Sequence, residues 1–232
     1  ICEGLVGSEM CIRDRSPFVQ KISSLGIPII SEIEFAYHYC NSKKICVTGS
    51  NGKTTTTLLI THLLNNAGLS AKAVGNVGES YAMSVAIDPP DYQVIELSSF
   101  QLDFMFSFKA DIALLLNITP DHLDRYQNSF DLYVNSKFRI TQNMTVNDHF
   151  IYNYDDPVIK EALAKRNLEC QTHPVSIFQK DGVDSWLDKE SIIIKINNQK
   201  QTIMSIHQLA QQGKHNVFLS LIHISEPTRP SQ

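Results

Sequence analysis

Apolar and polar residues alternate in blocks along most of the chain, in the order expected when strands alternate with helices. Four runs rich in apolar and β-branched residues have the length and composition of buried strands. They are KKICVTG at 43–49, SAKAVGN at 70–76, YQVIELS at 92–98 and DIALLLNIT at 111–119. HFIYNY at 149–154 predicts a fifth strand.

Helical patterns fall between these runs. KTTTTLLITHLLNNAG predicts a helix that ends at Gly68, another helix precedes the third strand, and residues 129–142 and those after Asp156 predict two more. Near the N-terminus a short helical pattern precedes GIPII, and Ser31 followed by Glu34 predicts a capping box that opens a helix.

The pattern changes toward the C-terminus. SIIIKI, Asn197-Asn198 and KQTIMSI together predict an antiparallel hairpin. The fold class predicted is therefore α/β, a doubly wound and mostly parallel sheet with a small antiparallel β appendage. Ligands in such sheets bind beyond the C-terminal ends of the strands.

Composition narrows the classes of function. The chain is 43% hydrophobic with a net charge of −4, so it can bury a core and carries no basic block for nucleic acid. It has no long apolar run for a membrane span and no signal-peptide pattern. Its five cysteines lack metal or disulfide spacing, which predicts free thiols and a cytoplasmic protein.

The two ends of the chain share an unusual relationship. One permitted coding of LVGSEMCIRDR at 5–15, read on the opposite strand, translates as LSLIHISEPT followed by Arg or Ser, which is the sequence of residues 219–229. The DNA resembles a transposon adapter used in library preparation. Residues 1–15 and 219–232 are therefore interpreted as translated adapter and excluded from fold reasoning.

A glycine-rich loop joins the first strand to the first long helix. Glycines let backbone N–H groups surround an anion at a helix N-terminus, a lysine adds positive charge for phosphates, and a threonine hydroxyl can bind Mg²⁺. The loop residues are Gly49, Ser50, Asn51, Gly52, Lys53 and Thr54. This pattern predicts a nucleotide phosphate site; the alternative is a plain glycine-rich turn. Thr55 to Thr57 fit helix packing better than chemistry.

Four further candidates lie after later strands. Glu96 ends an apolar strand and is a candidate Mg²⁺ ligand; the alternative is a strand-end carboxylate exposed to solvent. His122, in NITPDHLDRY, is a candidate ligand or acid/base group, or a structural histidine. Lys137, judged by spacing alone, is a solvated helix lysine. Asn76, between Gly75 and Gly78, marks a ligand contact or a tight turn.

Taken in order, TGSNGKTTT, GNVG, ELSSFQL, NITPDHLDRY, YVNSKFRI and GKHNV resemble the Mur ligases of peptidoglycan synthesis. ELSSFQL with DHLDRY is similar to the members that add D-glutamate. The loop alone is also shared with folylpolyglutamate synthases and cyanophycin synthetase. The resemblance implies that residues 16–40 are the tail of an N-terminal UDP-binding domain. It implies too that 41–218 are most of a central ATPase domain, with a third domain missing.

The resemblance also assigns roles. It implies that the phosphate loop, with Thr55 and Asn216, binds ATP, and that Asn76, Ser98 and His122 contact the muramoyl substrate. Thr54 and Glu96 would hold one Mg²⁺, and His122 with a carbamylated Lys137 a second. Lys53, Glu96, His122 and Lys137 would then be the catalytic set.

The implied reaction joins D-glutamate to UDP-N-acetylmuramoyl-L-alanine through an acyl phosphate, with ATP and two Mg²⁺ ions. The full-length protein is expected to be a cytoplasmic monomer without nucleic-acid or membrane partners. The fragment alone is expected to be inactive. The alternatives are another amide ligase of this fold, of the folylpolyglutamate synthase type, or an ATP-binding module without ligase activity.

Overall fold

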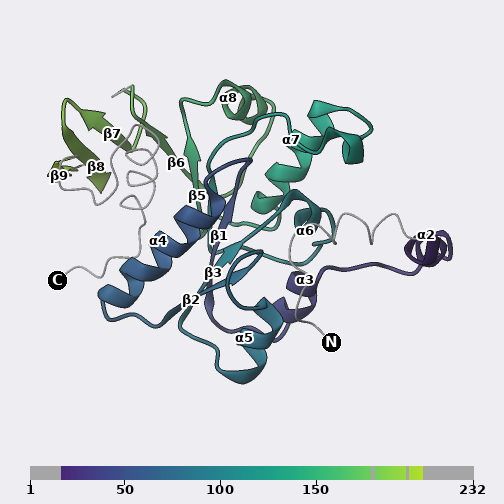
Figure 1. The fold of residues 1–232 in the computed structure, drawn as a ribbon. Helices are drawn as coiled ribbons and strands as arrows, with labels where there is room; N and C mark the ends of the chain where they lie inside the picture. The colour runs from purple at the N-terminus through teal and green to yellow at the C-terminus, as the bar shows by residue number, and fades with distance from the viewer. Residues whose placement is uncertain (1–16, 179–180, 197–198, 206–232) are drawn as a thin grey trace.

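The computed structural model describes residues 17–178, 181–196 and 199–205, and these form one sheet with helices on both faces (Figure 1). The strand order within this part of the chain is β2-β3-β1-β4-β5-β6-β7-β8-β9. The strands are β1 (Lys43–Thr48), β2 (Ala71–Gly75), β3 (Tyr92–Glu96), β4 (Ile112–Leu115), β5 (His149–Asn153), β6 (Gln171–Ser176), β7 (Ser185–Asp188), β8 (Ser191–Ile196) and β9 (Gln199–Ser205).

Pairing is parallel from β2 across to β7 and antiparallel from β7 through β8 to β9. The predicted fold class, a doubly wound sheet with an antiparallel appendage, is confirmed. The predicted hairpin is β8 and β9, whose connecting residues Asn197 and Asn198 lie outside the described part of the chain.

The helices divide between the two faces because each parallel strand buries side chains on both sides. Ile60 and Leu64 of α4 (Lys53–Asn66) pack with Ile45 and Val47 of β1, while Cys46 faces the core on the opposite side of the sheet. Figure 1 shows α4 crossing one face of the sheet over β1, β2 and β3. The helices are α2 (Pro17–Ser24), α3 (Glu32–Tyr37), α4 (Lys53–Asn66), α5 (Tyr81–Ile87), α6 (Ser99–Asp103), α7 (Phe130–Phe138) and α8 (Pro157–Ala164).

Several elements differ from the sequence prediction. The helix predicted over 129–142 is α-helical only to Phe138 and continues as the 3₁₀ helix η2 (Arg139–Thr141). The prediction missed α6, β6 and β7. Pro174 lies inside β6 and removes a backbone donor, and β7 has only 4 residues, so neither strand has the usual sequence pattern.

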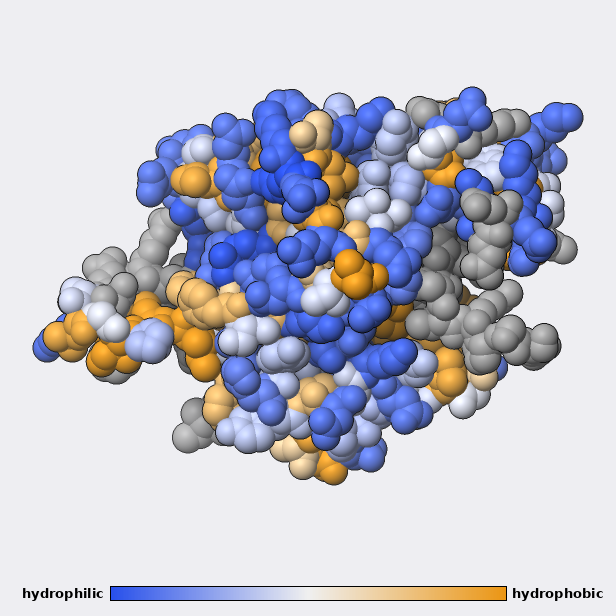
Figure 2. Space-filling view, turned by 180° about the vertical axis from the view of Figure 1, so that it is seen from behind, coloured by the Kyte–Doolittle hydropathy of each residue, from blue (hydrophilic) through white to orange (hydrophobic). Residues whose placement is uncertain are grey.

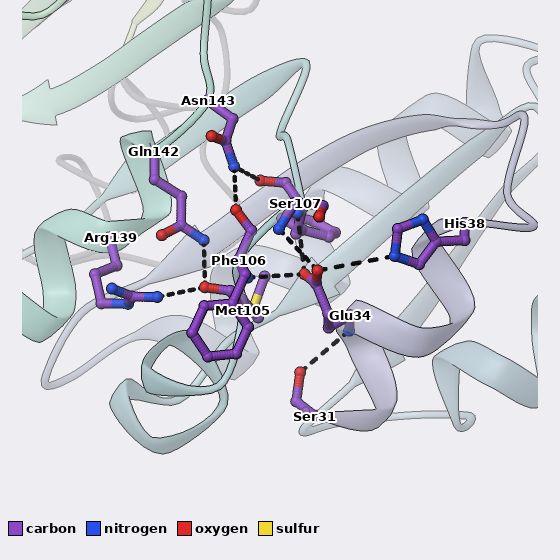
Figure 3. A network of polar contacts seen from close by, with 10 residues as sticks. Ser31, Glu34, His38, Met105, Phe106, Ser107, Arg139, Gln142 and Asn143 are labelled. Atoms are coloured by element: carbon purple, nitrogen blue, oxygen red, sulfur yellow. Dashed lines mark hydrogen bonds and ion pairs between the residues drawn. The ribbon is translucent and has the colours of Figure 1, made fainter. Parts of the chain in front are cut away.

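The capping box predicted at Ser31 is only half present. The Ser31 hydroxyl accepts a hydrogen bond from the Glu34 N–H at 3.1 Å, as a capping residue should. The Glu34 carboxylate, however, turns away and accepts the backbone N–H groups of residues 106–108 (Figure 3). Glu34 therefore ties α3 to the loop between α6 and β4.

The segment before α3 presents apolar side chains to solvent. Leu25, Ile27 and Ile30 are exposed and lie outside the core clusters, whereas Ile33 and Ala36 of α3 are buried in one of them. Figure 2, which views the molecule from behind, shows apolar residues gathered at the end that carries α2. Among the described residues, no helix combines the length and apolar character that a membrane crossing needs.

Candidate nucleotide site

The candidate residues gather where the topology reverses. β3 and β4 pair with β1 from opposite sides, so the chain leaves β1 between them. A doubly wound sheet opens a crevice at such a point, beyond the C-terminal ends of the strands. The glycine-rich loop follows β1 there, and Glu96 ends β3.

The loop backbone has the shape that an anion cradle requires. A Cβ at Gly49 would lie 3.0 Å from the Leu116 Cβ, so only glycine fits without displacement. Gly52 has a φ of 84° and begins α4 without a side-chain cap. The first hydrogen bond of the helix runs from the Thr56 N–H to the Gly52 carbonyl at 3.0 Å. The N–H groups that precede it have no partner within the helix and are directed out of its end, the arrangement that binds anions in other proteins.

Lys53 places its charge over this loop. Its Nζ donates to the Gly49 carbonyl at 3.0 Å and the Ser50 carbonyl at 3.1 Å. Partial burial lowers the pKa of Lys53 from its ordinary value, although the nearby carboxylates Glu96 and Asp121 oppose that shift. The ammonium therefore lies at the anion cradle, partly shielded from water.

Glu96 is a buried carboxylate with two polar partners. It is 1% exposed, and it accepts hydrogen bonds from the Thr54 hydroxyl at 2.8 Å and the Asn76 amide at 3.0 Å. The Asn76 N–H also donates to the Glu96 carbonyl at 3.0 Å. The interpretation of Glu96 as a strand-end carboxylate open to solvent is therefore wrong.

Lys137 is not a solvated helix lysine, as spacing alone predicted. It is 2% exposed, and its Nζ lies 2.9 Å from the Gly49 carbonyl and 3.4 Å from the Thr48 hydroxyl. The Nζ is also 5.3 Å from the centre of the Tyr133 ring. Burial, with a smaller contribution from the charge of Lys53, lowers the pKa of Lys137 to about 7.

His122 lies at the rim of the site. Its side chain is about half exposed, 3.5 Å from an Asp121 carboxylate oxygen and edge-on to the Phe100 ring. It has a left-handed backbone with a φ of 48°. Within the described residues, no direct hydrogen bond joins His122 to Glu96 or Lys137.

The other predicted site residues, Ser98, Thr55 and Asn216, differ in where they lie. Ser98 is the N-cap of α6 and forms a full capping box with Gln101. Thr55 is exposed in the first turn of α4. Asn216 lies outside the described residues.

Sequence reasoning missed two residues whose side chains form hydrogen bonds with the loop. Asn117, just after β4, exchanges hydrogen bonds with the backbone of Asn51. The Tyr133 hydroxyl lies 3.1 Å from the Ser50 hydroxyl. A signal for Tyr133 was available, because it precedes Lys137 by four residues and so shares its helix face.

The donor set at the loop fits a magnesium nucleotide. Thr54 and Glu96 supply a hydroxyl and a carboxylate, oxygen donors of the kind Mg²⁺ prefers, at the start of the helix. Over the ranges that the structure describes, no three His, Cys, Asp or Glu side chains are grouped to hold a metal on their own. Thr54 and Glu96 lie beside the phosphate loop, so an ion held by them would also meet bound phosphates.

Comparison with known proteins agrees with this geometry. The family model described as "Mur ligase middle domain" matches residues 47–222. UDP-N-acetylmuramoylalanine–D-glutamate ligases from Bacteroides fragilis and Christiangramia forsetii are 48% and 47% identical over 210 and 205 residues. These alignments cover 90% and 88% of this chain but 47% and 46% of the relatives, so the chain spans about half their length.

Solved structures show the same fold at low identity. A UDP-N-acetylmuramoyl-L-alanyl-D-glutamate–2,6-diaminopimelate ligase aligns with a TM-score of 0.60 at 18% identity, covering 88% of this chain and 44% of that one. A Mycobacterium tuberculosis folylpolyglutamate synthase aligns with a TM-score of 0.56 at 12% identity, covering 88% and 56%. Together, the family match over residues 47–222 and the phosphate loop at the switch point establish that this chain belongs to the Mur ligase family, through its middle domain.

Proposed function

We propose that this chain is the nucleotide-binding part of an ATP-dependent ligase that joins D-glutamate to UDP-N-acetylmuramoyl-L-alanine. The observation that carries the proposal is the cluster of Lys53, Glu96 and Lys137 around one phosphate loop. The 48% identity to a D-glutamate ligase over 210 residues supports that substrate among the family's alternatives.

In this proposal the loop binds the ATP phosphates. Residues 49–55 surround the phosphates, with the backbone N–H groups of residues 52–55 facing them, and the Lys53 ammonium neutralises charge on the terminal phosphates. Thr54 and Glu96 would hold one Mg²⁺, and His122 with a carbamylated Lys137 would hold a second. Bound magnesium would neutralise the phosphate oxygens and stabilise the charge that moves during phosphoryl transfer.

Lys137 binds a metal only if its amine becomes an anion. In the proposed modification, the neutral Nζ attacks the carbon of CO₂, one N–H proton is lost to solvent, and a carbamate forms. The pKa of about 7 supports this chemistry, because it leaves a large share of the amine unprotonated near neutral pH. The Thr48 hydroxyl and the Lys53 charge lie beside the site to stabilise the product.

The chemical problem for such a ligase is that two anions must meet. The substrate carboxylate attacks the γ-phosphate, giving an acyl phosphate and ADP, and the amine of D-glutamate then displaces phosphate. Lys53 offsets the repulsion in the first step, and Asn76 is placed beside Glu96 to contact the muramoyl substrate. Ser98, as the cap of α6, fixes the adjacent backbone. No cysteine takes part.

We further propose the cellular setting and organisation that this activity implies. The protein acts as a cytoplasmic monomer, with residues 16–40 at the end of a UDP-binding domain and 41–218 in the ATPase domain. The 232-residue chain by itself is expected to bind ATP but not to complete ligation.

The test measures ADP release by the full-length protein that contains this segment. Lys53→Ala and Glu96→Ala should each reduce release that depends on both D-glutamate and the muramoyl substrate by about 10²–10³-fold, since each removes charge stabilisation in the transition state. Lys165→Ala, at an exposed lysine of α8's C-terminal end, is the control and should retain normal activity.

Near-normal activity in either site variant would refute the proposal. ADP release that follows a folate and glutamate instead would favour a folylpolyglutamate synthase activity. Nucleotide binding without any substrate-dependent release would favour an ATP-binding module.

A further inference from the structure

Asn117, two residues after the end of β4, forms hydrogen bonds with the phosphate loop through both its backbone and its side chain. The loop backbone meets it at three points: the Ser50 N–H donates to the Asn117 carbonyl at 3.0 Å, the Asn51 N–H donates to its Oδ1 at 2.8 Å, and its Nδ2 donates to the Asn51 carbonyl at 3.0 Å. We propose that Asn117 is a positioning residue that holds the phosphate loop in its anion-binding conformation. This inference rests on the proposed nucleotide-binding function.

The chemistry of the asparagine amide suits this task. A carboxamide offers an acceptor and a donor side by side, so it can pair with both the N–H and the carbonyl of one residue, as a neighbouring strand would. Aspartate would place an acceptor against the Asn51 carbonyl, and serine is too short to reach both groups. Asn117 thus extends the β1–β4 pairing by one side chain beyond the last strand residues, Thr48 and Leu115.

The pairing decides which loop N–H groups remain for a ligand. Those of Ser50 and Asn51 are taken up by Asn117, so the peptide of Gly52 and the following helix end are fixed at the mouth of the cradle. The same post-β4 segment holds Ser50 a second time, because the Thr119 N–H donates to the Ser50 hydroxyl at 3.0 Å.

Packing places the loop against the same segment. The Cβ that any other residue would carry at position 49 would lie 3.3 Å from the Asn117 nitrogen, besides its closer approach to Leu116. The Asn117 side chain itself is only half-buried, so it contributes little to the hydrophobic core. Its side-chain hydrogen bonds go to Asn51 of the loop, and this is the reason to assign it a role in ligand binding.

Removing the amide should lower phosphate affinity by releasing the loop. Two ordinary hydrogen bonds together change the equilibrium constant between the ordered and the released loop by about tenfold, and apparent affinity falls by about that factor once the released loop predominates. Asn117→Ala should therefore weaken binding of inorganic tripolyphosphate and of Mg·ATP by about tenfold. In the full-length protein the KM for ATP should rise by a similar factor, while the KM for D-glutamate stays unchanged.

The experiment uses calorimetric titration of the 232-residue chain with tripolyphosphate and with Mg·ATP, and steady-state kinetics of the full-length protein. Asn143→Gly is the matched control, since Asn143 also donates two side-chain bonds to backbone carbonyls, those of Phe106 and Phe108, away from the loop. Asn143 has a φ of 61°, which glycine adopts freely. Thermal unfolding of each variant reports whether it is folded, and Asn117→Ser serves as a milder second variant.

The inference stands if the Asn117 variants lose tripolyphosphate affinity while Asn143→Gly keeps it, even where Asn143→Gly has the lower Tm. It is overturned if the unsubstituted chain binds and the folded Asn117 variants bind equally well, or if only their stability falls. If the unsubstituted chain binds neither tripolyphosphate nor Mg·ATP, the proposed nucleotide function is refuted and this inference with it.

Discussion

Glu34 offers a sharp test of how the segment before β1 stabilises the domain. Its carboxylate is 2% exposed and accepts three backbone hydrogen bonds, from Phe106 at 3.0 Å, Ser107 at 2.7 Å and Phe108 at 3.0 Å. On the opposite side of this loop, side chains of residues 139, 142 and 143 donate to its carbonyls (Figure 3). The loop thus depends on side chains from both directions.

The expected loss follows from these contacts. A hydrogen bond to a charged group contributes about 1.5–3 kcal/mol, and the three bonds share one carboxylate, so their energies do not add in full. Glu34→Ala also strands three N–H donors, and we expect a loss of roughly 3–5 kcal/mol in the free energy of unfolding. For a domain of this size that lowers Tm by about 2–4 °C per kcal/mol.

The assay is urea denaturation of the chain followed by circular dichroism, with Glu32→Ala as the control. Glu32 lies two residues away on α3, and its carboxylate accepts hydrogen bonds from the Ser80 hydroxyl and the Ala82 N–H, both at 2.6 Å, on an exposed face. We expect the control to lose about 1 kcal/mol, as for an exposed capping contact. A Glu34→Ala loss no larger than that of Glu32→Ala would refute the reasoning.

The pH dependence gives the same prediction a second measurement. Burial by itself would raise the pKa of Glu34, but the N–H donors of residues 106–108 outweigh burial and lower it from its ordinary 4.5. The folded state therefore binds this proton less readily than the unfolded state. The stabilisation is complete above pH 4.5 and is lost as pH falls through the lower folded pKa. Glu34→Ala should flatten that part of the stability profile.

Two further predictions concern the site. Lys137→Ala in the full-length protein should abolish ADP release. Short carboxylic acids such as acetate should restore part of this activity by occupying the space of the carbamate. Absence of rescue would indicate that the unmodified amine is the functional group. Gly75→Ala should destabilise the chain by at least about 2 kcal/mol, as strain at a special backbone position does. The added Cβ would lie 2.6 Å from the Glu96 carbonyl oxygen at a φ of 96°. A Tm within about 2 °C of the unsubstituted chain would contradict this steric argument.

Much of the fold could be predicted from local patterns. β1 to β5 and α4 have apolar runs or clear helix boundaries, and the glycines of residues 49–52 mark a connection that can approach a ligand closely. β6 and β7 could not be found in this way. Their strand geometry comes from pairing with β5 and β8, which overrides a weak local preference.

The candidate site, like the fold, was predictable from the sequence only where its residues are close together in the chain. The nucleotide-binding role of Lys53 and Thr54 is predictable because the loop, the lysine and the helix start are contiguous, so short-range chemistry defines them. Burial of Lys137, the partner of Asn117 and the destination of the Glu34 carboxylate involve residues 88, 66 and 72 or more positions apart. Such contacts arise only when the sheet and its covering helices assemble, because a side chain's burial and hydrogen-bond partners depend on which distant backbone the tertiary structure brings beside it.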